Sequence, residues 1–142
     1  MQSILRGTCL PVVSLRYFTA YEPRRRPDTA ISKWTRSMFE NKPIPIYGTG
    51  EQTRDITFVD DTINGTISSA ETDGVESETF NIGSGSRVSV NEVVEMLIGL
   101  TQSRKTRITN EAEKSGGVQD THADITEVKQ VLQLQLDYGH SD

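Results

Sequence analysis

Apolar residues in the first third of the chain fall into one short run and one helical stripe. The run over residues 11–18 is rich in β-branched and aromatic side chains, which predicts a buried parallel strand. Ile31, Trp34 and Met38 then recur at helical spacing and predict a helix over residues 29–41. The chain is therefore expected to begin as a strand followed by a helix.

The next segment predicts two strands and a second helix. Residues 44–46 alternate around a proline, which suits a strand at a sheet edge and not a central one. Residues 56–59 are strand-like, and Asp60 or Asp61 is expected to N-cap the helix that follows, because a carboxylate there accepts free backbone N–H groups. The buried stripe of this helix is expected to be Val59, Ile63, Ile67 and Ala70.

The strongest periodic signal lies in the middle of the chain. A strand over residues 79–82 leads through a Gly- and Ser-rich turn to Ser89 and Glu92, which have the spacing of a capping box. The helix that they open is expected to bury Val90, Val93, Val94, Leu97 and Ile98.

Two weaker elements complete the pattern. Residues 105–110 predict one more strand, and Asp124 and Glu127 predict the start of a last helix that frays after Leu136. Strands thus alternate with helices, so the fold class is α/β. The hydrophobic elements are few for a complete doubly wound sheet, which favours part of a larger fold.

Composition excludes several classes of protein. The 142 residues favour one domain, and a net charge of −5 argues against a nucleic-acid partner. Cys9 is the single cysteine, which excludes an internal disulfide framework and fits a cytoplasmic location. No apolar run is long enough to span a bilayer, and no membrane partner or metal site is predicted.

Gly83-Ser84-Gly85 stands between a predicted strand and a predicted helix, where a dinucleotide fingerprint would stand. Val88 occupies the place of its third glycine, so a tight turn is the preferred interpretation and the cofactor-binding residues stay unknown. The helix start over residues 89–91 is expected to favour an anion through its free N–H groups, with the amide of Asn91 as a further donor.

Arg54 is the strongest candidate for binding a ligand. Its planar fork suits a diphosphate, although a salt bridge with Asp55 or Asp60 is an equally good interpretation of the spacing alone. Tyr47 has two interpretations as well: a core aromatic, or a ring that packs on a nucleobase.

The run from Tyr47 to Asp61 joins a Gly-x-Gly turn, Arg54 and paired aspartates. Together with residues 15–18 and 81–83, it resembles the C-terminal half of NAD-dependent epimerases and dehydratases, which are extended short-chain dehydrogenase/reductase enzymes. Within this family, the sequence most resembles UDP-glucose and UDP-glucuronate 4-epimerases. The resemblance runs from about residue 10 to residue 132.

The resemblance implies a fold and a division of the chain. Residues 1–142 would form a single partial domain: the C-terminal part of a Rossmann-like extended SDR fold with a small substrate-binding subdomain and an incomplete sheet. Residues 10–20 and 55–85 would supply Rossmann-sheet strands and a helix. Residues 21–54 and 86–142 would form the substrate-binding subdomain.

The resemblance also implies contacts with a UDP-sugar. The implied substrate-binding residues are Thr19, Ala30, Ile46, Tyr47, Arg54, Asn91 and Lys114. Four positions depart from the family pattern. Thr19 stands for a common asparagine, Glu22 for a glycine, Lys114 for an arginine and Gly117 for an aspartate that contacts ribose. Glutamate at position 22 would be strained if the backbone there had a positive φ.

The family's catalytic parts are not in this sequence. It has no Tyr-x-x-x-Lys pair and no three-glycine NAD motif, so no catalytic residue is predicted and NAD is expected only in a full-length enzyme. The resemblance implies a UDP-hexose-binding portion of a sugar 4-epimerase that acts through a 4-keto intermediate. Its expected partner is the missing N-terminal half, and the full-length enzyme is a possible homodimer.

Other interpretations stay open. The chain would be a fragment, a degenerate gene product or one half of a split protein. Its alternative functions are a non-catalytic nucleotide-sugar-binding module, a vestigial fragment, or part of a nucleotide-sugar 4,6-dehydratase.

Overall fold

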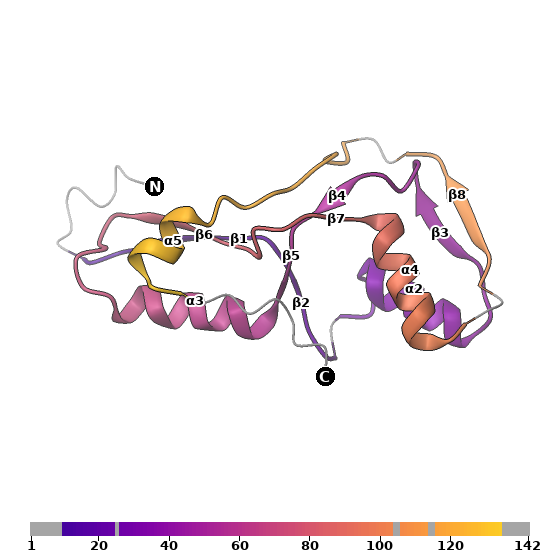
Figure 1. Cartoon of the computed structure of the whole chain (residues 1–142), viewed down its shortest axis with the longest axis horizontal. Coiled ribbons are helices and arrows are strands. Elements are labelled where there is room, and N and C mark those ends of the chain that lie inside the picture. The colour runs from indigo at the N-terminus through magenta and orange to yellow at the C-terminus, as the bar shows by residue number, and fades with distance from the viewer. Residues whose placement is uncertain (1–9, 25, 104–105, 114–115, 135–142) are drawn as a thin grey trace. The chain divides into compact units, whose positions relative to one another are not determined.

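The structure is a computed structural model that describes residues 10–24, 26–103, 106–113 and 116–134. These residues divide into two compact units. Unit 1 contains residues 10–21, 55–86 and 122–134. Unit 2 contains the described residues of 22–54 and 87–121. The chain therefore passes between the units four times, and residues distant in sequence come together inside each unit (Figure 1).

Unit 1 contains two pairs of parallel strands and two helices. Its elements are β1 (Ser14–Tyr17), β2 (Thr19–Tyr21), β5 (Ile56–Phe58), α3 (Val59–Glu71), β6 (Thr79–Ile82) and α5 (Thr126–Val131). β1 pairs with β6, and β2 pairs with β5. Between β1 and β2 the chain changes its strand partner from β6 to β5. The amide of Phe18 still donates to the carbonyl of Ile82, and the amide of Thr19 donates to the carbonyl of Asp55. The strand predicted over residues 11–18 thus forms over 14–17 and continues, after Phe18, as β2.

The helix α3 differs from its prediction in two respects. It begins at Val59 with Phe58 as its N-cap, so Asp60 and Asp61 lie inside the first turn and do not cap it. The predicted stripe is also wrong, since Ile63 is 48% exposed and Ile67 is 49% exposed. Val59 is half-buried and Ala70 is exposed. The residues of α3 that are buried are Asp61, Gly65 and Ser69.

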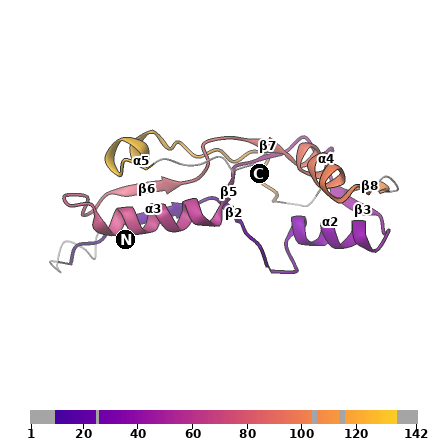
Figure 2. The ribbon, with the colours of Figure 1, turned by 60° about the horizontal axis from the view of Figure 1, so that its bottom comes forward.

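The close approach of α3 to β6 explains which residues of α3 are buried. A Cβ atom at Gly65 would lie 2.9 Å from Cδ1 of Ile82, so the helix sits too near the strand for a larger side chain to fit without movement. The buried residues of α3 recur at intervals of four and so share the face that contains Gly65, whereas Ile63 and Ile67 are half exposed. Figure 2 shows α3 running along β6.

The core of unit 1 draws on the end of the described chain. Its buried members are Val75, Phe80, Ile82, Ala123, Ile125, Val128, Leu132 and Leu134. The resemblance implies a substrate-binding subdomain that includes residues 86–142, and the structure groups residues 122–134 of that range with unit 1. Their apolar side chains pack on β6, so this segment belongs with the strands of unit 1. The predicted fraying after Leu136 lies outside the described residues.

Unit 2 packs two helices on a parallel strand pair. Its elements are α2 (Ala30–Phe39), β3 (Ile44–Tyr47), β4 (Thr53–Arg54), β7 (Val88–Ser89), α4 (Val90–Thr101) and β8 (Ile108–Glu111). β3 pairs with β8 in parallel and β4 with β7 antiparallel, so among the described strands β3 is at an edge, as its proline predicts. In Figure 2, α2 and α4 lie together beside β3.

The core of unit 2 confirms two predicted helices. It consists of Trp34, Met38, Ile44, Ile46 and Val94, with Val90, Val93, Leu97 and Ile98 packed against it. The indole of Trp34 donates to the carbonyl of Pro45 at 3.1 Å, which ties α2 to β3. The capping box of Ser89 and Glu92 is present at the start of α4.

The predicted α/β class is confirmed, and the strands of the described chain form only a partial sheet. None of the helices in the described ranges is long and apolar enough to cross a membrane.

Candidate functional site

The structure places the predicted substrate-binding residues in both units. Unit 2 contains Ala30, Ile46, Tyr47, Arg54 and Asn91. Thr19 is the first residue of β2, in unit 1. Lys114 lies outside the described residues. The contacts below are those within unit 2, and the role of Thr19 stays a prediction from the resemblance.

Arg54 is held by three backbone carbonyls. Its Nη1 donates to Thr53 at 2.6 Å and to Gln119 at 3.0 Å, and its Nη2 donates to Val118 at 2.7 Å. These contacts fix the plane of the guanidinium group against the segment that contains Val118 and Gln119. An arginine with a fixed plane binds a ligand with less loss of conformational freedom than a mobile one.

Arg54 makes no salt bridge with a described carboxylate, so a structural ion pair with Asp55 or Asp60 is not its role here. Its three hydrogen bonds use three of the five N–H donors of a guanidinium group. Nε–H and one hydrogen of Nη2 make no hydrogen bond to any residue that the structure describes. Two adjacent donors of this kind match two oxygens of a phosphate or carboxylate.

Asn91 holds the glycine turn that precedes β4. Its Nδ2 donates to the carbonyl of Thr49 at 3.1 Å and to the carboxylate of Glu51 at 2.9 Å. Its backbone amide donates to Gly50 at 3.0 Å. Gly50 has a φ of 79°, and a Cβ atom there would collide with the Asn91 side chain. The two amide hydrogens of Asn91 are therefore engaged within the turn.

The start of α4 does not offer the free N–H groups expected for an anion. The amide of Val90 donates to Gln52 at 3.1 Å, and that of Asn91 to Gly50. The amide of Glu92 donates to the hydroxyl of Ser89 at 3.2 Å. This expectation is wrong because the turn before β4 supplies acceptors that the local sequence of the helix does not reveal.

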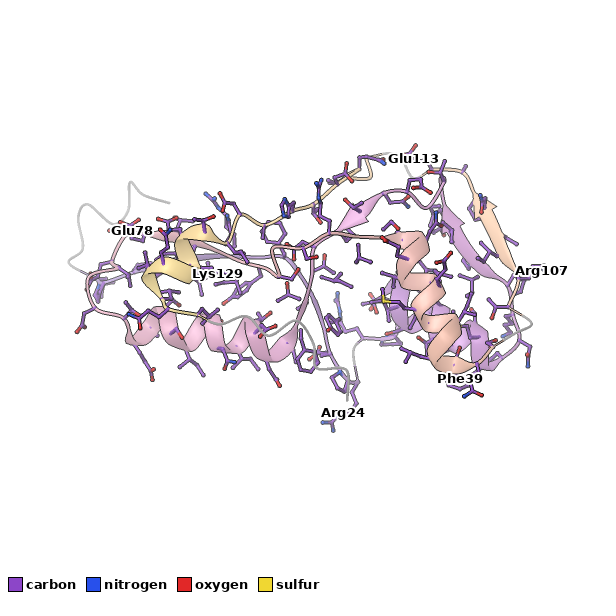
Figure 3. All side chains as sticks on the ribbon, viewed as in Figure 1. Arg24, Phe39, Glu78, Arg107, Glu113 and Lys129 are labelled. Carbon is purple, nitrogen blue, oxygen red and sulfur yellow. The ribbon has the colours of Figure 1, made fainter. Side chains whose placement is uncertain are left out.

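The other predicted residues of unit 2 differ in exposure. The side chain of Ile46 is 2% exposed and belongs to the core. Tyr47, the next residue of β3, is 40% exposed, so it is not a core aromatic. Ala30 is the exposed first residue of α2. Glu22 is not among the residues with positive φ; Arg24 is, at 63°, so the strain expected at position 22 is absent. Arg24 lies on a loop and points away from the ribbon in Figure 3.

Thr53 and Asp120 join this arrangement without having been predicted. Oδ1 of Asp120 accepts hydrogen bonds from the Thr53 hydroxyl at 2.5 Å and from the Thr53 amide at 3.2 Å. These bonds hold the pKa of Asp120 below its ordinary value, the hydroxyl contributing most. No sequence motif marks the pair, because the two residues are 67 positions apart.

The Gly83-Ser84-Gly85 turn does not fit a dinucleotide phosphate. The amides of Ser84 and Gly85 donate to the Asp55 carboxylate at 2.7 and 3.0 Å, so they are not available to a ligand. A Cβ atom at Gly83 would collide with Ala123, and one at Gly85 with Ile125. The glycines therefore permit close packing, as expected for a tight turn. The amides of Ser84 and Gly85 in this loop are therefore not free to bind the phosphates of NAD.

Comparison with known proteins agrees with this α/β architecture and defines its class. The crystal structure of UDP-glucuronic acid 4-epimerase from Bacillus cereus, in complex with UDP-glucuronic acid and NAD, matches 97% of this chain with a TM-score of 0.91 and 34% identity. The fold is thus a Rossmann-like epimerase fold, of which this chain has a partial sheet.

Residues 2–83 match the NAD dependent epimerase/dehydratase family, and the chain belongs to this family. It is 36% identical over 123 residues to an uncharacterized UDP-glucose epimerase of Bacillus subtilis, and 38% identical over 124 residues to a UDP-glucuronate 4-epimerase of Thermodesulfobacterium geofontis. Each alignment covers 87% of this chain but 39% and 38% of the relative. The B. cereus structure is covered over 44% of its length. The chain therefore spans about two fifths of the length of these relatives.

Proposed function

We propose that this chain is the UDP-hexose-binding portion of an NAD-dependent sugar 4-epimerase. The observation that carries the proposal is the hydrogen bonding of the Arg54 guanidinium group. Three backbone carbonyls fix its guanidinium group, and two of its donors remain for a ligand. Relatives of the chain are UDP-sugar 4-epimerases, which supports a nucleotide diphosphate as the ligand.

The chemistry of Arg54 suits a diphosphate for three reasons. The guanidinium group stays charged at all physiological pH values, so its attraction for an anion does not depend on protonation. Its planar fork places two parallel hydrogen bonds on two oxygens. Arg54 is also half-buried, which weakens solvent screening of its charge. Hydrogen bonds to charged groups contribute about 1.5–3 kcal/mol each.

Titration of the full chain with UDP and with uridine tests the proposal by calorimetry. The chain should bind UDP measurably, and Arg54→Ala should weaken UDP binding by about ten- to a hundredfold while it leaves uridine binding unchanged, because uridine has no phosphate. Arg54→Lys should recover only part of the affinity, since an ammonium group lacks the planar fork.

Arg107→Ala is the matched control for the loss of one positive charge. Arg107, labelled in Figure 3, is exposed just before β8 and has no hydrogen bond or ion pair from its side chain to a described residue. It should bind UDP as the wild type does. The absence of UDP binding by a folded wild-type chain, or equal effects of the two variants, would contradict the proposal.

We further propose that a polypeptide with the N-terminal part of the family fold is the partner of unit 1. β1 pairs on one side with β6, and no described strand pairs with its other side. Parallel sheets are normally covered on both faces. Ile63 and Ile67 form an exposed apolar stripe on α3. The chain covers about two fifths of its relatives, so the remaining length is available for added strands.

Co-expression with the N-terminal part of the T. geofontis relative tests this partner. Replacement of Ile63 and Ile67 by lysine should abolish co-purification while the chain alone keeps its melting temperature, because both side chains are half exposed. Ile108→Lys, at a side chain of unit 2 that is 44% exposed, is the control and should co-purify. A wild-type pair that stays separate would remove this partner without affecting the UDP result.

A further inference from the structure

The segment of residues 118–121, which holds Arg54, is itself hydrogen-bonded to Thr53 through both its backbone and a side chain. The amide of Thr53 donates to the carbonyl of Gln119 at 3.1 Å, and the amide of Thr121 donates to the carbonyl of Thr53 at 3.2 Å. Asp120 adds the two hydrogen bonds from Thr53, including the short one from its hydroxyl. This segment therefore carries the carbonyls that hold Arg54.

We propose that Asp120 is a positioning residue for anion binding: by binding Thr53, it holds the carbonyls of Val118 and Gln119 where they fix the guanidinium group of Arg54. The proposal rests on the proposed function, in which Arg54 binds the diphosphate. Asp120 acts through Arg54 and does not itself contact the ligand.

The surroundings of the segment show why it needs an anchor. Val118 is 59% exposed, and Gln119 and Asp120 are exposed too, so burial contributes little to holding the backbone in place. Gly116, just upstream, has a φ of 81°, and glycine restricts the backbone least. Among the described residues, Thr53 and Arg54 are thus the ones whose hydrogen bonds hold residues 118–120 in position.

Charge alone predicts the opposite effect, which makes the proposal testable. A carboxylate near an anion site repels the anion, so removal of Asp120 should tighten UDP binding if electrostatics dominated. If position dominates, Asp120→Ala should weaken UDP binding, because Arg54 becomes mobile and must be ordered again when the ligand binds. The expected loss is roughly three- to tenfold.

The variants separate these effects. Asp120→Asn removes the charge but keeps an oxygen that accepts from Thr53, so it should bind UDP as well as the wild type or better. Thr53→Val removes the hydroxyl donor with little change in shape and should weaken UDP binding as Asp120→Ala does. Glu95→Ala removes a negative charge from an exposed position in α4, and it should leave UDP binding unchanged.

Calorimetry on the full chain with UDP and uridine is the first measurement. The proposal expects Asp120→Ala to weaken UDP binding with uridine binding unchanged, and Asp120→Asn to restore the affinity. Equal losses for UDP and uridine would show a merely structural role and overturn the proposal. Unchanged or tighter UDP binding by Asp120→Ala would overturn it too.

Hydrogen exchange of the Arg54 guanidinium group, followed by NMR without ligand, is the second measurement. The Nη hydrogens should exchange slowly in the wild type and fast in Asp120→Ala. This result would stand even if the wild type did not bind UDP, a case that would refute the proposed function alone. Nη hydrogens that stay protected in Asp120→Ala would overturn the positioning role.

Discussion

Ser84 donates two hydrogen bonds to the same oxygen of Asp55, from its amide at 2.7 Å and from its hydroxyl at 2.8 Å. The other oxygen of Asp55 accepts from the amides of Gly85 and Ala123, each at 3.0 Å. Asp55 is 0% exposed. One buried carboxylate thus joins three separate parts of unit 1: the start of β5, the turn after β6 and the segment before α5.

Replacement of Asp55 by alanine should destabilise unit 1 by more than about 3 kcal/mol. One buried and two part-buried amides would lose their acceptor, and each unsatisfied group costs about 1–3 kcal/mol. Asp55→Asn should also destabilise, because its NH₂ group would face an N–H donor. Urea unfolding followed by the NMR signals of Gly85 and Ala123 measures the effect.

Asp73→Ala is the control for this loss of a carboxylate. Asp73 is exposed in the loop after α3, and its side chain makes no hydrogen bond or ion pair with a described residue. Its free energy of unfolding should stay within about 0.5 kcal/mol of the wild type. If Asp55→Ala changed the free energy of unfolding equally little, the carboxylate would not hold the three segments together as its contacts indicate.

Gly83 predicts a second test, of packing. Its backbone φ is not in the left-handed region, so alanine can adopt the conformation, but its Cβ atom would collide with that of Ala123. Gly83→Ala should therefore cost about 1–3 kcal/mol through overpacking. Ala123→Gly should relieve the collision, so the double variant should be less destabilised than the sum of the single variants. Thermal unfolding of the four proteins measures the coupling, and strict additivity would show that the two positions do not touch.

The sequence predicts α4 well and α3 poorly, for a physical reason. Ser89 and Glu92 carry their signal in their chemistry and spacing, and the capping box forms within one turn. The stripe of Ile63 and Ile67 shows only that α3 has an apolar side. Which side packs on β6 depends on the distance of approach, and that distance is set by Gly65, a residue without a hydrophobic signal.

The candidate site shows the same limit. Arg54 was identifiable because arginine suits phosphate and stands in a recognisable pattern. Val118 and Gln119 were not, since they bind Arg54 through backbone carbonyls, which every residue has. The engagement of Asn91 with the turn at Gly50 was equally hidden, because it depends on contacts between segments that are 40 residues apart.

Asn91 gives a third prediction, which separates its role in the turn from direct ligand binding. Asn91→Asp would place a carboxylate against that of Glu51 and against the carbonyl of Thr49, so it should cost about 1–2 kcal/mol. Addition of Glu51→Gln should restore a donor–acceptor pair and most of the stability. Urea unfolding measures both variants.

UDP titration of the same variants decides between the two roles. If Asn91 acts by holding the turn, UDP affinity should recover in the double variant together with stability. Recovery of stability without recovery of UDP affinity would show that the amide of Asn91 contacts the ligand itself, as the resemblance implies.

The capping box gives a fourth prediction, of pH dependence. Oε2 of Glu92 accepts from the Ser89 amide at 2.7 Å and from its hydroxyl at 2.8 Å. The amide contributes most to lowering the pKa of Glu92 from its ordinary value, followed by the hydroxyl. A carboxyl whose pKa is lower in the folded state stabilises that state above the pKa of the unfolded chain, about 4.3 for glutamate, and loses this effect as the pH falls through the folded value. The start of α4 should therefore be fully capped at neutral pH and should fray below about pH 4.

Exchange of the Ser89 amide hydrogen, followed by NMR between pH 7 and pH 3, measures this effect. The exchange should accelerate below about pH 4 by more than its intrinsic pH dependence explains. Glu92→Gln keeps an oxygen acceptor but cannot titrate, so its Ser89 amide should show no such step. A step of equal size in Glu92→Gln would assign the acid effect to another group.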